Sequence, residues 1–333
     1  MIKIIKDDIL KRLKSDNFIP LVELLKNNKN KIFAAVAPSI AGQYGNDVSM
    51  AQLRSAFKLL GFTDMIEVAL FADILTIREA YEFDKLVKSE RDFFLTSCCC
   101  PLWINLVRKK YPELFAYMPT SVSPMIASGR FLKKIYPSSK VVFISPCDAK
   151  KVEAEAEDLK GDIDYVLNFE ELNKLFLASK IKLKDLDKSE KDQASFAGRI
   201  YARTGGVSFS VKTVINRIAP GRLINLRAKQ YHGTKECIEV LDKLSSNQVI
   251  NANFIEGMGC VGGCVGGPRM GVDYKEATNH VNNFAEDSII MTPMDNPNIL
   301  DLLKIFGLND FSDIVGDNEL ARMLVRESVK KYT

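Results

Sequence analysis

The stretch FFLTSCCCPLWINLVRKKY, residues 93–111, opens with a short apolar run at 93–96, continues into a cysteine triplet, and ends in a segment with helical periodicity at 103–111. We expect a strand, a loop and a helix in that order. The same alternation recurs along most of the 333-residue chain. It predicts an α/β fold with mainly parallel sheets flanked by helices. In such folds the chemistry lies in loops at the carboxyl ends of the strands.

The boundaries of the expected elements follow from the sequence pattern. Short apolar runs predict strands at 31–36, 65–70, 93–96, 141–144, 163–167, 223–228 and 249–255. Helical periodicity predicts helices at 49–60, 73–87 (with an acidic face), 103–111, 123–135, 169–178, 208–217 and 235–244. A charged stretch at 180–192 predicts a surface loop. We divide the chain into an N-terminal helical extension (1–30), a core domain (31–297) and a polar, helical C-terminal tail (298–333).

Composition restricts the class of protein. Lys and Arg number 46 and Asp and Glu 42, and a net charge of +4 is no footprint for nucleic acid. No apolar run approaches the roughly 18–20 residues of a membrane span. The N-terminus, MIKIIKDDILKRLK, lacks the apolar core and cleavage site of a signal peptide and resembles an amphipathic helix. We therefore expect a cytoplasmic protein with reduced thiols, no nucleic-acid partner and no membrane insertion.

Three segments contain all but one of the seven cysteines. They are TSCCCPLW (96–103), SPCDAKKVE (145–153) and EGMGCVGGCVGGPR (256–269). Thiolates are soft ligands that suit either zinc or an iron–sulfur cluster. Zinc sites usually combine close cysteine pairs with each other or with histidine, whereas this chain has no C-x2-C and only His232 and His280. The dispersed cysteines favour an iron–sulfur cubane. Cys237 has no motif around it and is interpreted as a structural or free thiol.

Two of these segments contain further polar or flexible residues. Glycines surround Cys264, and two of them, Gly262 and Gly263, separate it from Cys260. Glycine lets backbone approach a ligand and can leave amide N–H groups facing an anion; the alternative is a tight turn with two buried thiols. Lys150 and Glu153 follow Cys147 by three and six residues. A lysine there can donate to an anionic ligand, or the two residues form a solvated surface pair.

The three segments resemble the signatures of the H-cluster domain of [FeFe]-hydrogenases, which are close to T-S-C-C-P-G-W, M-P-C-x-x-K-x-x-E and E-x-M-x-C-x-G-G-C. They occur here in the same order and with compatible spacing. Weaker similarities at 37–39, 72–77, 111–114 and 203–207 extend the resemblance to roughly residues 31–275. The resemblance implies two lobes, each with a mainly parallel sheet, and a metal site in the cleft between them.

The resemblance also assigns roles to individual residues. It implies a [4Fe-4S] cluster with an attached diiron subsite that has CO, CN⁻ and azadithiolate ligands, together the H-cluster. The cluster ligands would be Cys100, Cys147, Cys260 and Cys264, of which the last also bridges to the diiron unit. The residues lining the cofactor would be Pro38, Ser39, Ser145, Pro146, Met258 and Gly263. The catalytic residues would be Lys150, as a donor to a cyanide, and a proton relay of Cys99, Glu79 and Glu82.

The first segment leaves two registers open, because it has three cysteines where the family has two. Counting back from the Pro-x-Trp that follows makes Cys100 the ligand and Cys99 the relay. Counting forward from the Thr-Ser that precedes makes Cys99 the ligand and Cys98 the relay. The spacing to Glu82 favours the first register. If the triplet is extended, Cys98 and Cys100 point the same way, and the extra thiol lies beside the cluster.

Several departures from the family pattern bear on function. Ser145 stands in place of a methionine, Leu102 in place of a glycine, and Pro119 in place of a relay serine. These changes resemble divergent, sensory-type branches, and the chain has no ferredoxin-type C-x2-C-x2-C run. The resemblance implies H2 and protons as substrates, ferredoxin or another external electron carrier, and maturation proteins. Three functions follow as alternatives: an [FeFe]-hydrogenase-like oxidoreductase, an H2-sensing regulatory protein, or a non-catalytic iron–sulfur assembly factor.

Overall fold

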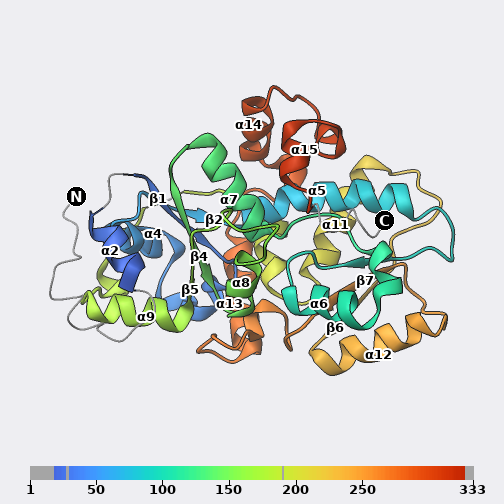
Figure 1. Cartoon of the computed structure of the whole chain (residues 1–333), viewed down its shortest axis with the longest axis horizontal. Coiled ribbons are helices and arrows are strands. Elements are labelled where there is room, and N and C mark those ends of the chain that lie inside the picture. Colours follow the sequence, from blue (N-terminus) through green and yellow to red (C-terminus); the bar gives the residue numbers. More distant parts are fainter. Residues whose placement is uncertain (1–18, 28–29, 190, 327–333) are drawn as a thin grey trace.

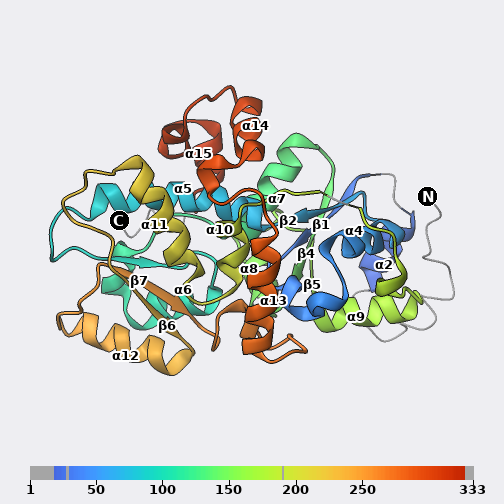
Figure 2. The same ribbon diagram turned by 180° about the vertical axis from the view of Figure 1, so that it is seen from behind.

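The computed structural model describes residues 19–27, 30–189 and 191–326. The parts of the predicted N-terminal extension and C-terminal tail at 1–18, 28–29 and 327–333 lie outside the described residues. Figures 1 and 2 show two lobes side by side, each built around a sheet, with helix α13 (Tyr274–Glu286) between them in both views. The predicted α/β fold with two parallel sheets flanked by helices is confirmed.

The first lobe contains a four-stranded sheet in the order β2–β1–β4–β5, in which every pair is parallel. Its strands are β1 (Ile32–Val36), β2 (Asp64–Glu67), β4 (Lys140–Ser145) and β5 (Tyr165–Asn168). Successive side chains of β1 belong to two different apolar clusters, because neighbouring residues of a strand point to opposite faces. One face packs against α2 (Ile19–Asn27), α4 (Met50–Leu59) and α9 (Phe169–Ala178), and the other against α7 (Pro124–Ile135).

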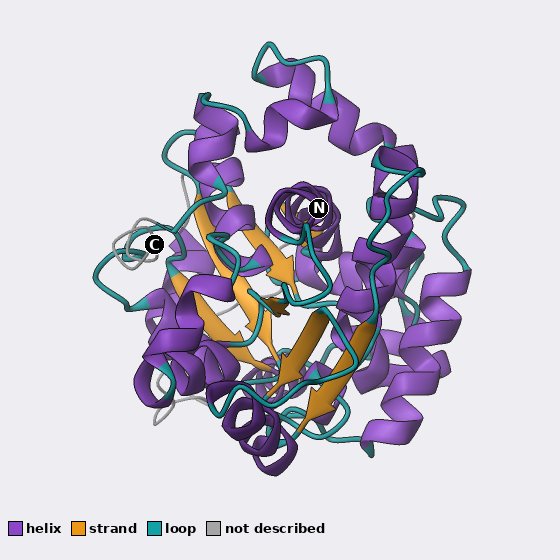
Figure 3. Ribbon diagram, turned by 90° about the vertical axis from the view of Figure 1, so that its right-hand side faces the viewer, coloured by secondary structure: helices purple, strands orange, loops and turns teal. Residues whose placement is uncertain are grey.

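The second lobe contains a three-stranded parallel sheet in the order β3–β7–β6. Its strands are β3 (Phe94–Thr96), β6 (Ala228–His232) and β7 (Phe254–Met258). The helices of this lobe are α5 (Ala69–Leu86), α6 (Pro101–Lys110), α11 (Gly206–Ile218) and α12 (Thr234–Ser245). In Figure 3 the strands lie inside a surround of helices, and β3 and β7 are buried along their whole length, whereas β6 is partly exposed.

Two predicted strands are wrong in their bounds. The expected strands at 223–228 and 249–255 lie almost entirely before the observed β6 and β7, and Leu223 and Val249 are 94% and 99% exposed. The backbone just before β6 is instead hydrogen-bonded to Asn253, just before β7. The Asn253 side chain accepts from the N–H of Arg227 and donates to the carbonyl of Asn225. The β-branched and apolar residues there gave a strand pattern that tertiary contacts override.

Helix α5 also differs from its prediction. β2 ends at Glu67 and α5 begins at Ala69, so the apolar run at 65–70 divides between a strand and a helix. Two carboxylates of the predicted acidic face, Asp73 and Glu79, are buried. Each of these carboxylates accepts a hydrogen bond from a residue outside α5, Asp73 from Ser195 and Glu79 from Thr96.

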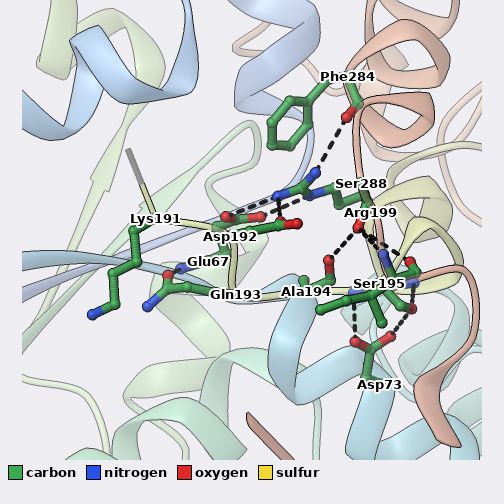
Figure 4. A network of polar contacts seen from close by, with 12 residues as sticks. Glu67, Asp73, Lys191, Asp192, Gln193, Ala194, Ser195, Arg199, Phe284 and Ser288 are labelled. Atoms are coloured by element: carbon green, nitrogen blue, oxygen red, sulfur yellow. Dashed lines mark hydrogen bonds and ion pairs between the residues drawn. The ribbon is translucent and has the colours of Figure 1, made fainter. Parts of the chain in front are cut away.

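The carboxylate of Asp73 ties α5 to two later segments. It accepts hydrogen bonds from the backbone N–H of Ser195 at 2.8 Å, from the Ser195 hydroxyl at 2.6 Å and from the amide of Asn296 at 2.9 Å. Figure 4 shows this contact beside a second buried one, in which Arg199 pairs with Glu67 at 3.0 Å. The two contacts anchor residues 195–199 to Asp73 on α5 and to Glu67 at the end of β2.

Replacing Asp73 with alanine is expected to lower the free energy of unfolding by at least about 3 kcal/mol, because three buried donors lose their acceptor together. Chemical denaturation followed by circular dichroism measures the change. Asp301→Ala is the matched control, since this aspartate on α14 (Pro297–Ile305) is exposed and makes only a 3.5 Å contact with Lys304. An equal, small effect of both substitutions would contradict the anchoring role.

The remaining elements are short or C-terminal. They are α3 (Ile40–Tyr44), α8 (Ala149–Ala154), α10 (Phe196–Arg199), α14 and α15 (Glu319–Met323). The predicted polar character of the C-terminal tail is wrong for its described part, because Ile299, Leu303 and Leu320 are buried in the main apolar cluster. Within the described ranges, no helix combines the length and the apolar character that crossing a bilayer requires.

Candidate metal-cluster site

One cavity lies where the carboxyl ends of β1, β3, β4 and β7 meet, so both sheets contribute to it. It brings together all of the predicted ligands and cofactor-lining residues and two of the predicted catalytic residues. These are Cys100, Cys147, Cys260 and Cys264; Pro38, Ser39, Ser145, Pro146, Met258 and Gly263; and Cys99 and Lys150. Glu79 and Glu82 do not line it. Residues more than 200 positions apart therefore converge at the edge that parallel sheets commonly use for binding.

The cysteine triplet forms a turn, so the extended conformation considered for it is wrong. The turn begins at Ser97, which has a φ of 97°, and it ends at Cys100, the residue that precedes α6. Cys99 and Cys100 both line the cavity, whereas Cys98 lines a separate, smaller cavity with Ser121 and other residues. The extra thiol thus faces away from the main cavity.

The thiols in the main cavity influence one another electrostatically. Burial raises the pKa of Cys260 to about 11, and the thiols of Cys100 and Cys147 add to the shift. Burial also raises the pKa of Cys264, with further contributions from Cys100, Cys260 and Cys147. Four mutually repelling thiolates in one apolar cavity are unfavourable without a cation, and bound iron would compensate for their charge. The donor set therefore fits an iron–sulfur cluster.

Neighbouring groups fix the orientation of several ligands. The backbone N–H of Gly259 donates to the sulfur of Cys100 at 3.3 Å. The hydroxyl of Ser145 donates to the carbonyl of Cys147 at 2.9 Å and accepts from its backbone N–H at 3.0 Å. Ser145 therefore stabilises the ligand turn that follows β4, and its hydroxyl is engaged there although its side chain lines the cavity.

The glycines around Cys264 have a different role from the predicted one. Gly262 and Gly263 have φ values of 81° and 92°, which other residues rarely adopt. A Cβ on Gly262 would lie 2.5 Å from the ring of Tyr274, and one on Gly263 would lie 2.8 Å from the backbone of Thr204. Their amide N–H groups donate to protein acceptors. The prediction that these amides are free to face an anion is wrong for both residues.

Lys150 and Glu153 form a buried ion pair, so the interpretation as a solvated surface pair is wrong. The ammonium of Lys150 lies 2.6 Å from the Glu153 carboxylate. Burial alone would lower the pKa of Lys150, but Glu153 and the thiols of Cys99 and Cys264 outweigh this and raise it. Lys150 is therefore a fixed cation in the wall of the cavity and can donate to an anionic ligand.

The two predicted relay glutamates lie on α5 behind the cysteine triplet. Glu79 accepts a hydrogen bond from the Thr96 hydroxyl at 2.5 Å, and the Cys98 thiol lies near its carboxylate. Glu82 accepts from the Thr120 hydroxyl at 3.0 Å. Thr120 therefore supplies the hydroxyl contact that Pro119 cannot make at the position where the family has a serine.

Burial raises the pKa of Glu79 to about 7, although the neighbouring Cys98 and Thr96 side chains lower it. The folded chain therefore binds a proton at this site up to about pH 7, whereas the unfolded chain releases it near pH 4.5. The contribution of Glu79 to stability is fully present below pH 4.5 and is lost as the pH rises to 7.

Glu79→Gln should remove this pH dependence. Between pH 4.5 and 7, the free energy of unfolding of the unsubstituted chain should fall by about 3 kcal/mol relative to the variant. Urea denaturation across that range measures the difference. Parallel pH profiles for the two chains would contradict the raised pKa.

The lining of the cavity fits an anionic cofactor, and with its open mouth the cavity has an empty volume of about 780 Å³, part of which is open solvent. The buried hydroxyl of Ser39, in its wall, has no hydrogen-bond partner among the described residues. Among the same residues, no three His, Cys, Asp or Glu side chains could together hold one metal ion; in a cubane, by contrast, each thiolate binds a different iron.

Some contributing residues had little or no signal in the sequence. Tyr201 lines the cavity, and its hydroxyl lies 2.6 Å from that of Thr76. Glu256, which opens the third segment, accepts from the backbone N–H groups of Gly205 and Ser208 at 2.7 and 2.8 Å. It thereby joins β7 to the start of α11. The motif contained Glu256, but only the fold reveals its partners.

Comparisons with known proteins agree with this geometry. The chain is 29% identical to Iron hydrogenase 1 of Clostridium pasteurianum over 282 residues, which cover 71% of this chain and 49% of that protein. It is 23% identical to a probable cytosolic Fe-S cluster assembly factor of Drosophila erecta over 295 residues, covering 73% of this chain and 62% of that protein. The chain thus spans about half the length of the first of these relatives.

The solved structure of a variant of [FeFe]-hydrogenase HydA1 from Chlamydomonas reinhardtii has the same fold. The match has a TM-score of 0.75 at 18% identity and covers 92% of this chain and 97% of that one. The family described as "Iron only hydrogenase large subunit, C-terminal domain" matches residues 30–268, which include all six cysteines of the three segments. The chain therefore belongs to the family of the C-terminal domain of the iron-only hydrogenase large subunit.

Proposed function

We propose that the chain is an [FeFe]-hydrogenase-like iron–sulfur oxidoreductase that reversibly cleaves H2 into protons and electrons. The observation that carries this proposal is the single cavity that gathers four cysteines from three distant segments together with Cys99, Lys150 and Met258. The hydrogenase relative supports it. An assembly factor that held a cluster without a diiron unit would have no need of a buried cation or of a thiol beside the ligands.

The proposal gives each group a task. Cys100, Cys147, Cys260 and Cys264 would hold a [4Fe-4S] cluster, and Cys264 would also attach the diiron unit. The bound cofactor supplies the bond-breaking and electron-transfer chemistry. Of the remaining lining residues, Lys150 donates a hydrogen bond to an anionic ligand, while Pro38, Pro146 and Met258 exclude water with apolar surface.

Proton transfer is proposed to follow the triplet and α5. Cys99 lines the cavity, and Glu79 lies near the adjacent Cys98. One helical turn further along α5, Glu82 contacts Thr120 and lies 2.9 Å from Arg78. Because Cys99 and Cys100 line the cavity whereas Cys98 does not, the geometry supports the register in which Cys100 is the ligand and Cys99 moves the proton.

Infrared spectroscopy after co-expression with maturation proteins tests the proposal. Sharp CO and CN⁻ stretching bands and H2 evolution with a reduced viologen are the expected result. Bands with slow turnover and saturable H2 binding would support an H2-sensing role at the same site. Iron and sulfide without these bands would support a cluster-assembly role, which the similarity to the Drosophila erecta protein favours as the second candidate.

The proposed partners follow from this chemistry. Electrons would pass between the cluster and ferredoxin or another external carrier, and separate maturation proteins would install the diiron unit. A cytoplasmic location remains our proposal, supported by the seven cysteines, all of which are free thiols.

A further inference from the structure

His232 is one of only two histidines in the chain, and the proposed chemistry gives it no task. It ends β6, where its register partner on β7 is Met258, two residues before Cys260. Its Nδ1 lies 2.7 Å from the backbone nitrogen of Gly262, in the middle of the loop between Cys260 and Cys264. A side chain from a neighbouring strand thus reaches the loop that presents two of the four proposed ligands.

The contact determines the state of the ring. Because the Gly262 N–H is the donor, Nδ1 must offer a lone pair, and the ring is neutral with its proton on Nε2. Glu236 lies behind the ring, with its carboxylate oxygen 3.8 Å from Nε2 and 3.0 Å from the His232 backbone nitrogen. A carboxylate on that side favours the proton on Nε2. His232 is therefore held between Glu236 and Gly262 as a hydrogen-bond acceptor.

The loop between Cys260 and Cys264 needs hydrogen bonds of this kind to hold one conformation. Gly262 and Gly263 both have positive φ, and glycine has many alternative conformations of similar energy. The carbonyl of Gly262 accepts from the backbone N–H of Thr204 at 2.9 Å. His232 and Thr204 therefore hold both backbone polar groups of Gly262, and His232 is the one that does so with a side chain.

We propose that His232 is a positioning residue for the metal site: by accepting the Gly262 N–H it fixes the loop that directs the thiols of Cys260 and Cys264 at one cluster. This inference rests on the proposed cluster. Groups behind metal ligands typically change metal affinity by about 10–100-fold when they are removed. His232 acts one step further back, through backbone, so we expect the lower end of that range.

Cluster retention tests the inference. The full chain and its variants are reconstituted anaerobically with iron and sulfide, and the decay of cluster absorbance is timed in the presence of an iron chelator. His232→Ala should lose the cluster about tenfold faster and change the EPR spectrum of the reduced cluster. His232→Asn should stay close to the unsubstituted chain in both measurements, because its Oδ1 can occupy the place of Nδ1 and accept the same N–H.

Two controls separate the outcomes. His280→Ala changes the other histidine, whose Nδ1 lies 3.5 Å from the Gly42 carbonyl, and should behave as the unsubstituted chain does. If His232→Ala does not fold, His232→Leu, which fills space without accepting, replaces it. Equal retention in all chains, or equal loss in the Ala and Asn variants, would overturn the positioning role. An unsubstituted chain that takes up no cluster would overturn the proposed function itself.

Discussion

Cys264→Ala is expected to remove the CO and CN⁻ infrared bands completely and to leave little reconstituted iron. Cys264 is half-buried, and its thiol interacts electrostatically with the other three proposed ligands, Cys100, Cys260 and Cys147. It is also the residue proposed to join the cluster to the diiron unit. Its loss removes one of four cluster bonds and the attachment point together, so no partial assembly with these bands is expected.

Cys237→Ala is the matched control for this experiment. Cys237 is also a free cysteine, in this case buried, and its thiol donates to the backbone carbonyl of Met258 at 3.4 Å. It does not line the cavity. The control should keep the bands and the iron content, with at most a modest loss of stability. Bands that persist in Cys264→Ala would refute the ligand assignment, whatever Cys237→Ala does.

The sequence predicted the parts of this site that depend on strand ends. A strand followed by a cysteine-containing loop occurs at β3, β4 and β7, and a parallel sheet places all such ends at one edge. The resemblance added which cysteines belong together. That is why the predicted ligands and lining residues occupy one cavity, although the bounds of β7 itself were misplaced.

The strand error at β7 has a physical origin. Its sequence, FIEGM, contains a glutamate and a glycine, both of which are disfavoured in strands. The fold compensates for each of them. Glu256 accepts N–H groups at the start of α11, and the ring of Trp103 covers Gly257, where a Cβ would lie 2.2 Å from it. Neither compensation involves a residue near β7 in the sequence, so no local pattern could reveal it.

The glycine loop and the cysteine triplet illustrate a second limit. Glycine spacing predicted close backbone approach, but the partners of Gly262 are Tyr274, at the start of the following α-helix, and His232, 30 residues earlier. The triplet conformation depends on Ser97, a non-glycine residue with positive φ. Such a conformation requires surrounding structure to maintain it, and periodicity contains no information about it.

Cys99→Ala is expected to retain the infrared bands and to lower H2 turnover by about 10²–10⁴-fold, the usual range for a positioned proton-transfer group. Cys99 lines the cavity beside Cys100, and a methyl group there can neither donate nor accept a proton. Viologen-coupled turnover, measured per chain that shows the bands, separates slow proton transfer from poor assembly. Full activity would refute the relay assignment.

The neighbouring cysteines decide the register. If Cys100 is the ligand, Cys100→Ala loses the bands that Cys99→Ala keeps, because the cluster then lacks one of its four thiolates, the one that accepts the N–H of Gly259. Cys98→Ala should keep the bands and lose less turnover than Cys99→Ala, since Cys98 lies near Glu79 but lines a different cavity from the proposed cofactor. The reverse pattern, with bands lost in Cys99→Ala and turnover lost in Cys98→Ala, would shift the assignment by one residue and make Cys98 the relay.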